Sequence, residues 1–143
     1  MENELFQEIV ENKKNSLKRY RKNRACVHRL EKKLALLEDR LTTIKSPNFS
    51  GMPRGGQPVT IADLISDKDE LESRIKRLKE KGKQIKSEIL EEIDTLEDSR
   101  YCEILEAYFI DGLSMEDIAD TEGYSTRRIY KLYSEAINIL SVK

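Results

Sequence analysis

Apolar residues recur at alternating intervals of three and four along much of the chain. This is the pattern of a helix that buries one stripe against another helix. In the first half, the stripe consists of Val27, Leu30, Leu34, Leu37, Leu41 and Ile44. Residues 4–45 contain neither proline nor glycine, so they predict one long helix, or two helices with a weak break between Asn12 and Ser16.

A second stripe follows a segment that predicts no regular structure. Residues 46–59 hold all three prolines and three of the six glycines, which indicates a connector. Thr60 can cap a new helix, with Asp63 three residues later, and this helix is expected to run to about Leu96. Its stripe comprises Leu64, Leu71, Ile75, Leu78, Ile85 and Ile89, while Lys68 and Gly82 occupy two positions where an apolar residue is due.

Two stripes of similar length joined by one connector predict an antiparallel, coiled-coil-like helical hairpin over residues 1–96. The stripes could instead pair between two chains. Because a two-helix hairpin has few ways to bury both stripes fully, some homo-oligomerisation is expected.

Residues 97–143 predict a small domain of short helices, so the chain as a whole is expected to be all-α. A first apolar stripe ends at Asp111 and Gly112, where glycine can take the left-handed conformation that stops a helix. Ser114 can cap a short second helix, and Ser125 can cap a last helix over 126–140. The buried stripe of this last helix is expected to be Ile129, Tyr133, Ala136, Ile137 and Leu140.

The spacing of Ala119, Gly123 and Ile129 is typical of a helix-turn-helix. A small residue lets two helices cross closely, a glycine permits the positive φ of a tight turn, and an apolar residue anchors the second helix. A small helical bundle that only resembles this motif is the alternative.

Charge is distributed unevenly although the net charge is only −1. Residues 13–33 hold ten basic residues and one acidic residue, whereas residues 94–143 hold five basic and eleven acidic residues. A basic block of this kind can face a polyanion, or it can simply be a solvated helix face. The candidate phosphate contacts in this block are Lys18, Arg19, Arg21 and Lys22.

In a helix-turn-helix, the exposed side of the second helix enters the major groove of double-stranded DNA. Arginine and lysine can reach guanine there, or phosphate beside it. The candidate DNA-binding residues on this helix are Ser125, Thr126, Arg127, Arg128, Tyr130, Lys131 and Ser134.

The chain offers little support for an enzyme. His28 is the only histidine, and no glycine-rich phosphate loop or ligand spacing for a metal is present, so neither a cofactor nor a metal site is expected. Cys26 and Cys102 are far apart and are expected to be reduced. No apolar run reaches the length of a membrane span and no leader pattern is visible, which predicts a cytoplasmic protein that is not associated with a membrane.

The stretch IDGLSMEDIADTEGYSTRRIYKLYSEAINIL, within residues 96–140, resembles sigma factor region 4, whose helix-turn-helix reads the promoter −35 element. The MPRGGQP segment, lying between a basic helix and this C-terminus, is similar to phage-encoded late transcriptional regulators of the RinA and ArpU kind. The resemblance implies an activator of phage or prophage genes that acts at the nucleoid of the bacterial host cell and also contacts host RNA polymerase. Glu103, Glu106 and Asp111 are the candidate contacts, or each only forms part of a solvated helix face.

Two alternatives stay open. The chain could be a coiled-coil adaptor without DNA-binding activity, or a phage DNA-packaging component with a domain like a helix-turn-helix. Arg54 in the connector could face a DNA groove or a partner, or the connector could only turn the chain.

Overall fold

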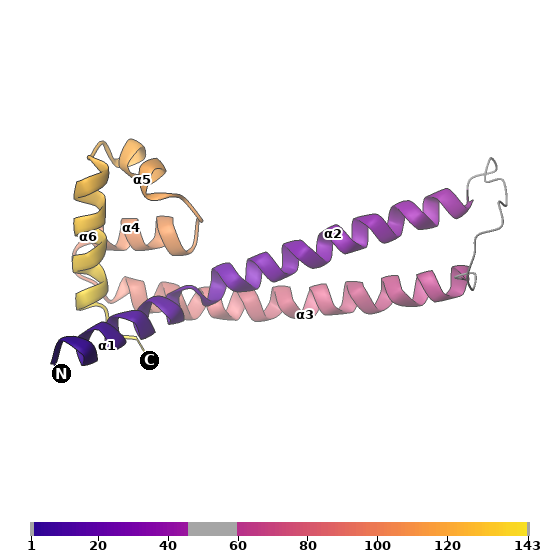
Figure 1. The fold of residues 1–143 in the computed structure, drawn as a ribbon, viewed down its shortest axis with the longest axis horizontal. Coiled ribbons are helices and arrows are strands. Elements are labelled where there is room, and N and C mark those ends of the chain that lie inside the picture. The colour runs from indigo at the N-terminus through magenta and orange to yellow at the C-terminus, as the bar shows by residue number, and fades with distance from the viewer. Residues whose placement is uncertain (1, 46–59, 143) are drawn as a thin grey trace. The chain divides into compact units, whose positions relative to one another are not determined.

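A computed structural model describes residues 2–45 and 60–142. These residues form six helices and no strand, which confirms the predicted all-α class (Figure 1). The helices are α1 (Glu2–Leu17), α2 (Arg19–Lys45), α3 (Ile61–Asp94), α4 (Ser99–Phe109), α5 (Met115–Glu122) and α6 (Thr126–Ile139). The connector and Arg54 lie outside the described residues.

The chain forms two compact units, and each of the two longest helices contributes to both. The core unit comprises Met1–Asn23 and Gly82–Lys143, and the hairpin unit comprises Arg24–Lys81. The sequence suggested a division near residue 96 instead. The core unit therefore contains α1 and parts of α2 and α3 in addition to α4, α5 and α6.

The long N-terminal helix is broken, but at Lys18, two residues beyond the segment that the sequence predicted. Counted back from Val27, the alternating spacing of the α2 stripe continues at Asn23 and Tyr20 and would next reach position 16. The next buried residue is instead Leu17, one position out of this register. Next to the break, the Arg19 Nε donates a hydrogen bond to the Ser16 carbonyl at 2.8 Å. The register shift explains why the break lies here.

The hairpin unit buries the central part of both stripes. Val27 and Leu30 of α2 are buried with Leu71 and Ile75 of α3, and the half-buried Leu34 and Leu78 pack against them. An ion pair of 3.4 Å joins Lys79 to Glu31. At the start of α3 the predicted cap is confirmed, because the Asp63 N–H donates to Thr60 Oγ1 at 3.1 Å.

The prediction that Leu37 packs in the apolar stripe of the hairpin is wrong. Leu37 is only half-buried and does not belong to this apolar cluster, although Leu41 and Leu64 are buried. The next expected apolar position on α3 holds Lys68, whose ammonium lies 3.8 Å from Glu72 on the same helix. A stripe interrupted by lysine offers less apolar surface to cover Leu37.

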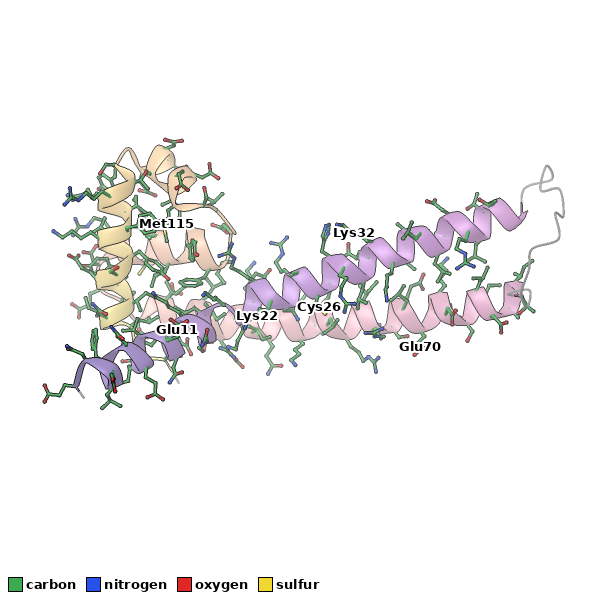
Figure 2. The ribbon with its side chains drawn as sticks, in the orientation of Figure 1. Glu11, Lys22, Cys26, Lys32, Glu70 and Met115 are labelled. Atoms are coloured by element: carbon green, nitrogen blue, oxygen red, sulfur yellow. The ribbon has the colours of Figure 1, made fainter. Side chains whose placement is uncertain are left out.

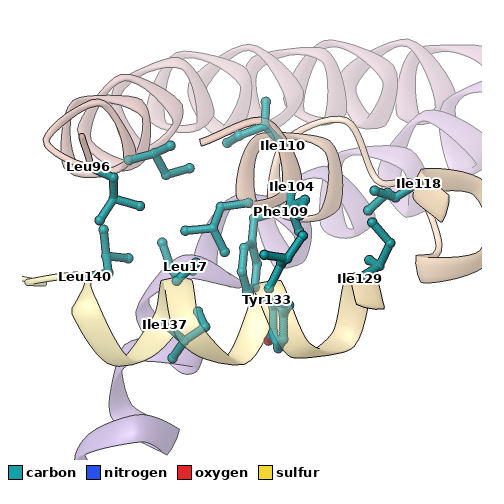
Figure 3. Packing of buried hydrophobic residues seen from close by; sticks show 14 of the residues in the cluster. Leu17, Leu96, Ile104, Phe109, Ile110, Ile118, Ile129, Tyr133, Ile137 and Leu140 are labelled. Carbon is teal, nitrogen blue, oxygen red and sulfur yellow. The ribbon is translucent and has the colours of Figure 1, made fainter. Parts of the chain in front are cut away.

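The core unit is built around Phe109, which is fully buried (Figure 3). Tyr108 contacts the Phe109 ring edge to face with 4.9 Å between centroids, and Tyr133 contacts Tyr108 at 5.5 Å. Leu17 brings α1 into the same cluster, as Figure 3 shows. Other buried residues of this cluster come from α3, α4, α5 and α6, and they include Ile89, Ile93, Ile104, Ile118, Ile129 and Ile137.

The second irregular position of the α3 stripe, Gly82, makes room for a polar neighbour. A Cβ at Gly82 would overlap the side-chain oxygen of Asn23. The α2 and α3 stripes therefore meet in the core unit through a glycine and an asparagine instead of an apolar pair.

Candidate nucleic-acid interface

The backbone between α4 and α6 has the turns and caps that the sequence predicted. Gly112 and Gly123 both take the left-handed conformation, each with φ of 75°. Ser114 caps α5, because its Oγ accepts from the Asp117 N–H at 3.1 Å. Ser125 caps α6 in the same way, accepting from the Arg128 N–H at 3.2 Å. These predictions are confirmed.

α5 and α6 are joined only by Gly123, Tyr124 and Ser125, and Figure 1 shows the short turn between them. The Gly123 N–H donates to the Ala119 carbonyl at 2.9 Å, which closes the end of α5. Ala119 is buried, as the close approach of two helices requires. This is the local geometry of a helix-turn-helix.

α6 has one buried side and one exposed side. Ile129, Tyr133, Ala136 and Ile137 are buried as predicted, and Leu132 joins them although it was not in the predicted stripe. The helix ends at Ile139, and the buried Leu140 caps it instead of forming its last residue. With this side anchored in the core, the opposite side of α6 faces solvent.

Arg127, Lys131 and Ser134 form a continuous strip along the exposed side, because residues three and four apart are neighbours on a helix. Tyr130 borders this strip and leaves half of its surface exposed. Two basic groups therefore project from the first half of α6, which is where a recognition helix contacts bases, and the Ser134 hydroxyl continues the strip just beyond it.

Arg128 is exposed but is held at the edge of the strip. Its guanidinium lies 4.8 Å from the centre of the Tyr124 ring, a cation–π contact across the turn. Ser125 uses its hydroxyl for capping, and Thr126 is half-buried. The predicted residues on α6 thus lie together, and their contact with DNA stays a prediction.

The basic block begins with two lysines that contact the core unit itself. The Lys13 ammonium donates to the carbonyls of Ile137 and Asn138, both at 3.1 Å. These carbonyls lie at the C-terminal end of α6, where a positive charge is favourable. Lys14 lies over the Tyr133 ring at 5.8 Å. Both lysines therefore help to attach α1 to α6.

The four predicted phosphate contacts of the block differ in their surroundings. Arg19 pairs with Glu88 at 3.2 Å, and the Arg21 guanidinium lies 4.8 Å above the Tyr108 ring. Lys18 is half-buried. Lys22, which is labelled in Figure 2, is exposed. Lys22 is consequently the most accessible of the four.

Sequence reasoning missed the packing of α1 and the start of α2 against α4 and α6. Tyr20 did carry a signal, since it lies one heptad before Val27 and is partly buried against the core. Lys13, Lys14 and Arg21 carried none, because a basic residue on a ring or at a helix end has the same sequence pattern as one on a solvated face.

Burial changes the acid–base properties of Tyr133 and Cys102 in the core unit. Desolvation raises the pKa of Tyr133 to about 12, with the neighbouring Tyr108 adding to the shift. Burial also raises the pKa of the Cys102 thiol, which contacts the carbonyls of Ile93 and Leu96 at 3.4 and 3.5 Å. Both Cys26 and Cys102 are free, as predicted.

A family model described as a protein of unknown function, DUF1492, matches residues 43–141. The chain belongs to the DUF1492 family. The matched region includes α3 to α6 and excludes α1 and nearly all of α2. No curated protein and no solved structure matches the chain. Membership of DUF1492 therefore does not assign a function to the chain.

In residues 2–45 and 60–142, no helix combines the length and the apolar content that crossing a bilayer demands. Within the same ranges, no three or more His, Cys, Asp or Glu side chains are grouped so that they could hold a metal ion.

Proposed function

We propose that this protein is a sequence-specific DNA-binding regulator of transcription that reads the major groove with α6. The observation that carries the proposal is the exposed strip of Arg127, Lys131 and Ser134, which lies opposite the buried side of a capped helix. The major groove admits an α-helix, and arginine and lysine recognise guanine there. The tight turn at Gly123, with Ala119 buried beneath it, supports the docking of α6 across α5.

In this proposal the basic residues have two roles. Arg127 and Lys131 contact base edges, while Arg128 is oriented by Tyr124 at the edge of the strip. Lys18 and Lys22 contribute phosphate contacts, which position the protein without reading sequence. Since residues 94–143 carry more than twice as many acidic as basic residues, binding through α6 alone is weak.

Additional affinity then comes from the basic block, from a second copy, or from host RNA polymerase. Glu103 and Glu106 are exposed on α4, so they are accessible to a polymerase subunit. The resemblance to RinA and ArpU regulators supports activation of phage or prophage genes in the bacterial cytoplasm.

The proposal is tested by selecting duplexes from a library with a randomised centre and measuring their affinity at several salt concentrations. We expect enrichment of one sequence and an affinity that falls as salt rises. If no sequence were enriched and no salt-dependent binding were found, the result would support an adaptor. Salt-dependent binding without enrichment would leave a non-specific DNA-binding protein and refute sequence-specific regulation.

A further inference from the structure

Glu92 of α3 is a buried carboxylate with an oxygen that lacks a hydrogen-bond partner. Among the residues that the structure describes, it is the only charged side chain that is buried, with 9% of its surface exposed. Its Oε2 is enclosed and accepts no hydrogen bond from any of these residues. Buried polar atoms nearly always have a partner, because losing water without gaining a hydrogen bond costs free energy. The oxygen therefore marks a position for a donor that a ligand can supply.

Glu92 lines a cavity of the core unit. The cavity has a volume of about 810 Å³ and is lined by the end of α3, the start of α2 and the segment that follows α6. Glu88, Glu91 and Thr95 line it together with Glu92, because positions three, four and seven residues apart share one side of a helix. Arg19 lines it from α2, and Val142 lines it from the segment after α6. All of the lining residues belong to the core unit.

The end of α3 concentrates negative charge. Glu91, Glu92 and Asp94 all lie in its last turn, and that turn holds no basic residue. The C-terminal end of a helix already carries a partial negative charge, so a cation is favourable there and a carboxylate is not. The end of α6 has such a cation, because the Lys13 ammonium donates to carbonyls there. α3 has acids at the equivalent place, which favours a cation as the ligand of the cavity.

The charges of the lining determine the class of this cation. Arg19 pairs with Glu88 at 3.2 Å, and the lining holds no second basic residue to balance Glu91 and Glu92. Three carboxylates and one guanidinium give the lining a net charge of −2. We propose that the cavity binds an aliphatic diamine or a longer polyamine, with one ammonium group donating to Glu92 Oε2. The second ammonium group then balances the remaining negative charge.

An organic cation fits this lining better than a metal ion does. In the described ranges, no three His, Cys, Asp or Glu side chains are grouped so that they could hold a metal ion. An ammonium group needs no such cluster, because its three N–H donors can reach separate acceptors. The volume lies within the roughly 300–1,000 Å³ of small-molecule sites. Val142 packs against the core and provides an apolar wall for the methylene groups of the ligand.

The test is isothermal titration calorimetry of the full chain with putrescine, a linear diamine. The measurement uses no DNA, so its failure would leave the proposed function untouched, and a salt concentration of about 0.15 M screens exposed charges. We expect saturable binding of one putrescine per chain. Glu92→Gln keeps the size of the side chain but removes its charge, and should weaken binding at least about tenfold. Glu97→Gln removes an exposed carboxylate outside the lining and should change the affinity by less than about twofold.

Arg19→Gln should have the opposite effect to Glu92→Gln. It releases Glu88 and makes the lining more negative, so putrescine should bind more tightly, which a loss of folding could not produce. Weaker binding to Arg19→Gln would contradict the charge argument. The proposal is overturned if putrescine shows no saturable binding, or if Glu92→Gln leaves its binding unchanged.

Butylamine, which lacks the second ammonium group, tests whether the ligand is a diamine. It should bind at least about tenfold more weakly than putrescine. Equally tight binding of butylamine would assign the cavity to a single ammonium group, such as a lysine side chain of a partner protein, and would also overturn the proposal.

Discussion

The turn between α5 and α6 can be tested with a single methyl group. In Gly123→Ala the added Cβ meets no atom within 4 Å, so the substitution creates no clash. Its effect is conformational, because φ of 75° costs a non-glycine residue about 1–2 kcal/mol. Alanine also lowers the conformational entropy of the unfolded chain, which stabilises the folded state by about 0.4–1 kcal/mol. We therefore expect a net loss of about 1 kcal/mol in the free energy of unfolding.

Urea unfolding followed by tyrosine fluorescence measures this loss. All six tyrosines lie within Met1–Asn23 and Gly82–Lys143, so their fluorescence reports on the core unit, whereas circular dichroism reports on both units. A loss of about 1 kcal/mol lowers the urea midpoint by roughly 0.3–1 M. Gly112→Ala is the matched control, since Gly112 has the same φ and equally open surroundings.

Gly123→Asn should cost less than Gly123→Ala, because asparagine tolerates the left-handed conformation better. If Gly123→Ala instead raised the midpoint, residue 123 would have to be helical in solution. The tight turn between α5 and α6 would then be refuted.

Three further predictions concern the hairpin, a buried tyrosine and the basic block. Leu30→Ala should reduce the stability of the hairpin unit by about 2–5 kcal/mol in denaturant unfolding, whereas the half-buried Leu37→Ala should cost about 1 kcal/mol or less. Because the pKa of Tyr133 is raised to about 12, its contribution to stability is complete below pH 10 and declines towards pH 12; Tyr133→Phe should lessen this decline in unfolding experiments at high pH. Replacing Lys18 and Lys22 by glutamine should reduce the slope of log affinity against log salt by about one for each lysine that contacts phosphate, and an unchanged slope would assign both to a solvated face.

Local features of the fold were predictable from the sequence because few residues decide them. The caps at Thr60, Ser114 and Ser125 need only a hydroxyl at the right place before an apolar pattern, and each was found where the sequence placed it. The turn at Gly123 was predictable for the same reason. The heptad spacing likewise predicted the buried cluster around Leu30.

Long-range packing was less accessible. The break at Lys18 follows from a one-residue register shift at Leu17, which matters only once α1 packs on α6. Lys13 was part of a charge block in the sequence, but in the structure it donates to carbonyls at the end of α6. No local pattern distinguishes these two roles, since the partner is more than one hundred residues away in the chain.

The candidate site shows the same division. The sequence placed all the basic residues of α6 on its exposed side, and the structure brings Arg127 and Lys131 into one strip. It did not predict that Arg128 would lie over Tyr124, because that contact depends on the geometry of the turn. Among the predicted residues of α6, the expected base contacts are therefore Arg127 and Lys131, with Arg128 at the edge of the strip.

The most direct test of base reading by α6 is the ratio of affinities for the selected duplex and for random duplexes. Arg127→Ala and Lys131→Ala should each lower this ratio by a factor that corresponds to about 1–3 kcal/mol of binding free energy. The stability of the core unit, measured by tyrosine fluorescence, should stay unchanged. Lys76→Ala, which removes an exposed charge from α3, should leave the ratio intact. If both α6 variants kept the full ratio and remained folded, α6 would not be the element that reads DNA.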